Sequence, residues 1–143
     1  MELSLNLEQA LERMLFVVEP GEFWLLGFPE PPSAQDLADL GQPSQLVLES
    51  AETSLLVGAG PGQAILERHG QAQVERGLRW IRFEAPMGWE LVGFLAKVCG
   101  ELAAAGVPIG AVCGYSRDHI FVPGKHLERV REVLSGLFPE QPA

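Results

Sequence analysis

The order of predicted elements in the second half of the chain constrains the fold more than any other feature. Apolar side chains there switch between the two-residue spacing of strands and the 3.6-residue spacing of helices. The predicted elements are a strand at residues 77–84, a helix at 89–105 and two strands at 107–113 and 118–122. A second helix, which Pro123-Gly124 opens, extends up to residue 137. One sheet with both helices on one face buries all these apolar stripes, so we expect an α+β fold.

The first half repeats part of this pattern less clearly. We predict a helix over residues 7–15, a strand over 23–28, a helix capped by Ser33 that ends at Gly41, and a hairpin with strands 45–49 and 53–57. Strand, helix and two strands in this order indicate a degenerate copy of the second half.

Charge and glycine content change between the two halves. Residues 1–76 carry 12 acidic and 3 basic side chains, a net charge of −9, whereas residues 77–138 carry 6 acidic and 7 basic, a net charge of +1. The glycine-rich run 58–62 lacks the Lys and Ser/Thr of a phosphate-binding loop and is interpreted as part of a linker. The predicted domains are a helical extension at residues 1–14, a degenerate half at 15–62, a linker at 63–76, a full domain at 77–138 and a tail at 139–143. The linker is predicted to carry a short helix near Gln63–Arg68.

The composition excludes several classes of protein. Hydrophobic residues form 47% of the 143 positions, which is enough for a buried core and excludes a disordered chain. The formal net charge of −9 repels phosphate backbones, so we expect no nucleic-acid partner. No apolar run approaches the roughly 18 residues that span a bilayer, and the first residues lack the basic start of a signal peptide. We expect a cytoplasmic protein with no membrane contact, no cofactor, no metal, and reduced Cys99 and Cys113.

Three stretches of the second half resemble the ACT domain family. They are Ile81-Arg82-Phe83-Glu84-Ala85-Pro86-Met87-Gly88-Trp89-Glu90-Leu91-Val92-Gly93, Gly106-Val107-Pro108-Ile109 and Tyr115-Ser116-Arg117-Asp118-His119-Ile120-Phe121-Val122. The hairpin over 45–57 resembles the first half of the same proteins, small bacterial two-ACT proteins related to aspartokinase regulatory regions and to the CASTOR arginine sensors. The resemblance covers residues 15–138. It implies ferredoxin-like (βαββαβ) ACT domains in tandem, with antiparallel sheets and helices on one face.

The turn that leads into the predicted helix over 89–105 is the first candidate binding site. The first turn of a helix leaves backbone N–H groups unpaired and partly positive, so it can hold a carboxylate. Gly88 lets the backbone approach a ligand, and Gly93 leaves room above the turn. Alternatively, the two glycines only shape the turn and the helix–sheet contact. The resemblance implies amino-acid binding here, where two domains meet, by Met87, Gly88, Trp89, Glu90, Leu91, Val92 and Gly93.

Ser116 and Asp118 form the second candidate, between the last two predicted strands. A carboxylate at Asp118 could hold an ammonium or guanidinium group, and the resemblance implies that an aspartate at this position faces the ligand. The alternative is an aspartate that closes a turn through neighbouring backbone N–H groups.

These features predict a non-enzymatic regulatory or sensor protein that binds an amino acid or related small metabolite at an interface between ACT-like halves. We expect a homodimer, with a regulated enzyme as a possible further partner. The alternative is a protein–protein interaction module without a small ligand. An enzyme centred on Asp118 and His119 is disfavoured, because neighbours in a strand point to opposite faces.

Overall fold

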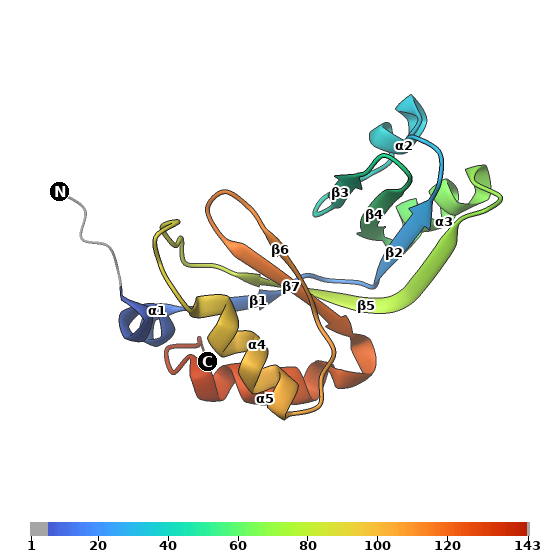
Figure 1. The fold of residues 1–143 in the computed structure, drawn as a ribbon. Coiled ribbons are helices and arrows are strands. Elements are labelled where there is room, and N and C mark those ends of the chain that lie inside the picture. Colours follow the sequence, from blue (N-terminus) through green and yellow to red (C-terminus); the bar gives the residue numbers. More distant parts are fainter. Residues whose placement is uncertain (1–5, 143) are drawn as a thin grey trace. The chain divides into compact units, whose positions relative to one another are not determined.

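A computed structural model describes residues 6–142 of the chain, which divides into two compact units. Unit 1 combines the N-terminal segment through Glu19 with the chain from Arg79 onward, and unit 2 spans Pro20–Leu78. Strand β5 (Gln73–Phe83) runs through both units (Figure 1), so its first part is described with unit 2 and its second part with unit 1. Within residues 6–142, no helix has the length and apolar character needed to cross a bilayer.

Unit 1 contains a sheet in the order β1-β5-β7-β6, with β1 antiparallel to β5 and β6 antiparallel to β7. Besides β5, its elements are α1 (Leu7–Arg13), β1 (Phe16–Val18), α4 (Phe94–Ala104), β6 (Gly110–Cys113), β7 (Asp118–Pro123), a 3-10 turn (Gly124–His126) and α5 (Leu127–Leu137). The predicted strand, helix, strand, strand, helix order is confirmed. The N-terminal strand β1 adds the fourth strand, which the sequence pattern of the second half alone did not indicate.

The core of unit 1 lies between the sheet and the pair of helices α4 and α5, which contact each other below the sheet in Figure 1. Helix α4 buries the stripe Phe94, Val98 and Leu102, as its sequence spacing predicted. Three buried aromatic rings form the centre of this core, with the Phe83 centroid 5.1 Å from Phe94 and 5.8 Å from Phe138.

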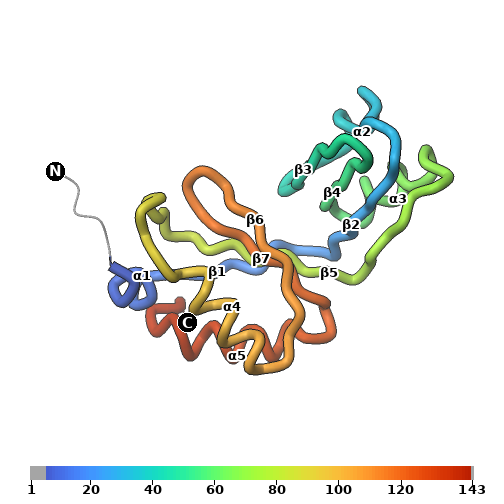
Figure 2. Tube along the Cα trace, viewed as in Figure 1, coloured from blue at the N-terminus to red at the C-terminus, as the bar shows by residue number. Residues whose placement is uncertain are grey.

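Local and long-range hydrogen bonds hold the N-terminal segment in place. Asn6 and Gln9 form a capping box at the start of α1, each side chain bonded to the backbone N–H of the other. The Gln141 side chain accepts from the Phe16 amide at 3.1 Å and donates to the Met14 carbonyl at 2.7 Å. Figure 2 shows this blue segment beside the red C-terminal end of the trace. Residues 1–5 of the predicted extension lie outside the described residues.

Unit 2 has the element order β, α, β, β, α, β and the strand order β3-β4-β2-β5, which is that of a ferredoxin-like fold. Its elements before β5 are β2 (Phe23–Phe28), α2 (Ala34–Ala38), β3 (Gln45–Leu48), β4 (Thr53–Gly58) and α3 (Ala59–Arg68). Pairs such as Leu26↔Leu55 place apolar side chains on the face that packs against Ile65 of α3. The predicted strand 23–28, the Ser33 cap and the hairpin are all present.

The interpretation of the glycine-rich run 58–62 as linker is wrong, because α3 begins there. Pro61 stands in the first turn, where its missing N–H has no intrahelical acceptor to lose. Gly62 packs against Trp24, and a Cβ at this glycine would come within 3.0 Å of the indole. Residues 63–76, predicted as a linker, hold the rest of α3 and the start of β5.

Candidate functional site

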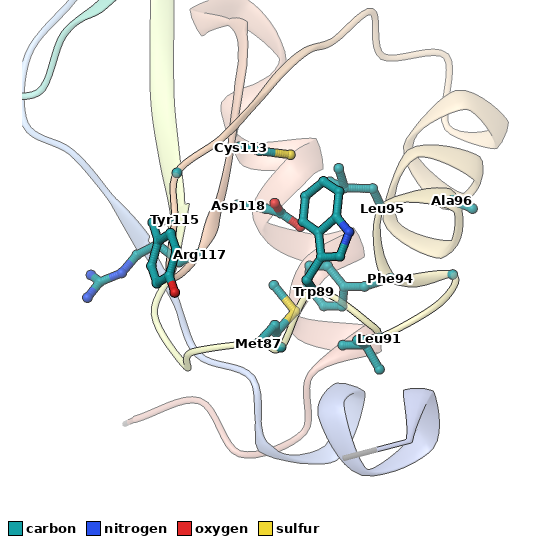
Figure 3. Close-up of a pocket in the computed structure, with 13 residues that line it drawn as sticks. Met87, Trp89, Leu91, Phe94, Leu95, Ala96, Cys113, Tyr115, Arg117 and Asp118 are labelled. Atoms are coloured by element: carbon teal, nitrogen blue, oxygen red, sulfur yellow. The ribbon is translucent and has the colours of Figure 1, made fainter. Parts of the chain in front are cut away.

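A pocket of about 250 Å³ opens in unit 1 where the loop before α4 approaches the turn between β6 and β7 (Figure 3). Both predicted site segments therefore contribute to one cavity. Its lining residues are Met87, Gly88, Trp89, Leu91, Gly93, Phe94, Leu95, Ala96, Cys113, Gly114, Tyr115, Arg117 and Asp118. All of them belong to unit 1.

Helix α4 begins at Phe94, so the prediction that the helix starts at Trp89 is wrong. Gly93 has φ of 95°, a left-handed conformation that a right-handed helix cannot pass through. The preceding loop forms a separate turn, in which the Leu91 amide donates to the Gly88 carbonyl at 3.1 Å. The loop that was expected to be helical instead forms one wall of the pocket.

The true start of α4 nevertheless faces the same pocket. Its first three residues, 94–96, all line the cavity, and Gly93 supplies no side-chain cap. The first intrahelical bond runs from the Lys97 amide to the Gly93 carbonyl at 2.9 Å. The N–H groups of residues 94–96 therefore have no acceptor within the helix and give this side of the pocket a partial positive charge.

Asp118 supplies negative charge on the other side of the pocket. It is the first residue of β7, and antiparallel pairing sets it opposite Cys113, the last residue of β6. Its hydrogen bond with the Cys113 side chain, followed by burial and the carboxylate charge, raises the pKa of the Cys113 thiol. Burial and the same carboxylate raise the pKa of Cys99. Neither thiol is activated as a nucleophile, since activation requires a lowered pKa.

Arg117 does not neutralise Asp118. Its guanidinium points away from the pocket in Figure 3 and donates to Glu84 at 3.2 Å. Glu84 also accepts from Arg82 at 2.5 Å, and these contacts lower the pKa of Glu84. Because Arg117 is bound to Glu84, the Asp118 carboxylate is the charged group that faces the pocket interior.

Six of the nine predicted ligand residues line the pocket: Met87, Gly88, Trp89, Leu91, Gly93 and Asp118. The other three do not. The Glu90 carboxylate folds back over Gly88, where a Cβ would lie 3.2 Å from it, and Val92 is 82% exposed. Ser116 contributes through its backbone, since its carbonyl accepts from the Met87 amide at 3.2 Å and joins the two walls.

Several lining residues were missed by the sequence reasoning. Phe94, Leu95 and Ala96 were assigned to the core stripe or left out, because the helix start was placed too early. Cys113 could have been found, because a tight turn over 114–117 necessarily sets it across from Asp118. Tyr115, which is fully exposed, carries no local signal for a pocket.

Asp118 and His119 point to opposite faces of β7, as strand geometry predicted. Asp118 lines the pocket, whereas the Nδ1 of His119 accepts a hydrogen bond from the indole of Trp80 at 3.1 Å. Burial, together with the charges of Arg117 and Arg82, lowers the pKa of His119. The two side chains therefore do not form an acid–base pair in one cleft.

Residues 73–136 match the family model described as the ACT domain. The matched range contains α4, β6, β7 and every residue that lines the pocket. This match agrees with the resemblance of the second half to ACT domains. No curated protein matches the chain.

Solved structures with a similar fold include two bacterial proteins and a regulatory subunit of aspartate kinase. A protein from Agobacterium tumefaciens has a TM-score of 0.70 at 21% identity, with 87% of this chain and 89% of that chain covered. A Vibrio cholerae protein of unknown function, described as a possible transport protein, has a TM-score of 0.70 at 21% identity over 92% and 94%. The ligand-free regulatory subunit of aspartate kinase from Thermus thermophilus has a TM-score of 0.63 at 14% identity over 86% and 96%.

Proposed function

We propose that this protein is a non-enzymatic regulatory module that binds a free amino acid, or a closely related metabolite, in the pocket of unit 1. One observation carries the proposal. Residues 94–96, whose amides have no acceptor within α4, and Asp118 line the same cavity. The amides can receive a carboxylate and Asp118 can receive an ammonium group, which matches the two charges of an amino acid.

The comparisons support a regulatory role. The ACT domain match covers the pocket, and a regulatory subunit of aspartate kinase shares the fold. We further propose that unit 2, whose strand order is also ferredoxin-like, is a second and degenerate ACT domain. A homodimer and a regulated enzyme partner remain part of this proposal, as does the expected relation to the arginine sensors. A ligand would act by favouring the arrangement that it contacts best.

A thermal-shift screen of the twenty amino acids at millimolar concentration tests the proposal. A ligand present at 100 times its dissociation constant should stabilise the protein by about 2.7 kcal/mol. We expect Asp118→Asn to abolish the shift while the protein still folds. Glu90→Gln is the matched control, because it removes one negative charge from the same rim but outside the lining residues.

Two results would contradict amino-acid binding at this pocket. One is the absence of stabilisation by any of the twenty amino acids. The other is an equal shift in the wild type and in Asp118→Asn, which would locate the ligand elsewhere.

A second candidate function is a protein-interaction module, favoured by the apolar rim of the pocket. Trp89 is 94% exposed, Val92 82%, and Tyr115 fully exposed. Such side chains are enriched where partners bind. The cavity itself is not filled by the protein's own side chains, which favours the small-ligand function.

A further inference from the structure

Helix α2 of unit 2 is attached in an unusual way. The residue that it buries is a carboxylate, Asp36, and its one leucine, Leu37, is 46% exposed. A helix of five residues is not stable by itself and depends on its tertiary contacts. The attachment of α2 therefore relies on what Asp36 contacts, with partial support from Leu40 against the unit 2 core.

Both oxygens of Asp36 are held by donors from the end of α3. Its Oδ2 lies 2.7 Å from His69 Nε2, and its Oδ1 accepts from Arg68 Nε at 2.8 Å. Arg68 also reaches Asp39 at 2.9 Å, at the end of α2. The Ser33 amide donates to Oδ2 at 2.9 Å and closes the capping box. The whole side chain of Asp36 is buried.

His69 lies between two carboxylates. Its Nε2 faces Asp36, its Nδ1 lies 2.5 Å from Glu30 Oε1, and its ring stacks on Phe28 with centroids 3.8 Å apart. An ionised carboxylate accepts hydrogen bonds and donates none, so both ring nitrogens must carry protons to satisfy both contacts. The geometry is that of a buried imidazolium.

We propose that unit 2 contains a pH-sensitive latch, in which protonated His69 holds α2 and loss of its proton releases the helix. The charged groups around the ring are Glu30 from the loop after β2, Asp36 and Asp39 from α2 and its end, and Arg68 from α3. With His69 protonated, three negative charges face two positive ones. Once the proton leaves to solvent, one positive charge remains and one carboxylate faces a ring lone pair.

The directions of the pKa shifts agree with this geometry. Burial by itself would lower the pKa of His69, but the hydrogen bonds to Glu30 and Asp36 outweigh burial and raise the pKa above its ordinary value of 6.5. Burial would raise the pKa of Asp36, yet the Ser33 amide, His69 and Arg68 together lower it to about 2. A raised histidine pKa means that the latch is strongest below pH 6.5 and weakens as the pH rises through the pKa of the latched state.

Hydrogen–deuterium exchange of the peptide over residues 31–41, corrected for the intrinsic exchange rate, tests the latch between pH 5 and 10. We expect constant protection up to about pH 6.5, then a loss of roughly tenfold per pH unit until His69 has titrated. The His69 ring resonance, followed by NMR, should titrate above pH 6.5.

Three variants make the test specific. His69→Gln should remove the pH dependence, and Glu30→Gln, which keeps the Asp36 contacts, should move the His69 titration to lower pH. His126→Gln, a histidine of unit 1, is the matched control and should behave as the wild type. Equal protection at pH 6 and pH 10 in the wild type, or a pH dependence that survives in His69→Gln, would overturn the latch.

Discussion

At the scale of single residues, Asp118 is the carboxylate that lines the pocket. It is a carboxylate at the first position of β7, and its nearest charged neighbour in sequence, Arg117, is bound to Glu84. The hydrogen bond from Cys113 does not neutralise its charge. A pocket with one carboxylate that no cation among residues 6–142 neutralises and one uncapped helix start has opposite polarity at its two ends.

The Cys113 thiol reports on this carboxylate. In a Cys99→Ala background, we expect Asp118→Asn to lower the pKa of Cys113, because the hydrogen bond and the negative charge that raise it are lost. The measurement is the alkylation rate of Cys113 as a function of pH, whose midpoint should move to lower pH. Glu90→Gln should leave the midpoint where it is. An unchanged midpoint in Asp118→Asn would show that the two side chains do not interact in solution.

At the scale of elements, α4 shows how one backbone angle positions a site. Gly93 has a left-handed φ, and a Cβ there would also come within 3.3 Å of Leu7 on α1. This residue ends the loop that forms one wall of the pocket and begins the helix that forms another. The start of α4 is therefore set by backbone conformation, because Gly93 supplies no side-chain cap.

Two glycine substitutions, one at the N-cap of α4 and one within the helix, should have opposite effects. We expect Gly93→Ala to destabilise the protein by about 1–2 kcal/mol, because alanine is strained at positive φ. Gly100→Ala, within the same helix and with open space around its Cβ, should stabilise it by about 0.5–1 kcal/mol. Urea denaturation followed by circular dichroism measures both. Equal effects of the two substitutions would mean that the φ of Gly93 does not limit the fold.

At the scale of the whole molecule, each unit is assembled from segments distant in sequence. In unit 1, the N-terminal segment supplies the edge strand β1, and Phe138, near the C-terminal end, is part of the buried core. Unit 2 connects α2 to the end of α3 through Asp36, 33 residues before His69. Both arrangements depend on contacts between segments that are far apart in the chain, and the local sequence pattern of either segment does not indicate its partner.

Removing the ring of Phe138 tests whether the C-terminal segment is part of the core of unit 1. This side chain is fully buried against Phe83 and Phe94. We expect Phe138→Ala to cost about 3–5 kcal/mol of unfolding free energy, because it leaves a cavity in an aromatic cluster. Ser135→Ala, on the exposed side of α5, should change the stability little. A loss below about 1 kcal/mol would show that the C-terminal segment is not part of the core.

Most strands and helices could be predicted because their signals are local. The apolar run of β2, the alternation in β5, the helical stripe of α5 and the Ser33 cap each lie within a few neighbouring residues. The errors occurred where glycine and proline are locally ambiguous. The run 58–62 resembles a linker by composition, but packing of Gly62 on Trp24 makes it a helix.

The sequence alone determined the element order of the second half, its helix stripes, the turn that precedes Asp118 and the opposite orientation of Asp118 and His119. These features follow from the spacing of apolar side chains, because a strand repeats every two residues and a helix every 3.6 residues regardless of where the segment lies in the fold. Only the tertiary structure decided that residues 94–96 and Asp118 line one pocket, and that a single histidine, His69, bridges two carboxylates. Such contacts join residues tens of positions apart, and their geometry exists only once the sheets have brought those segments together.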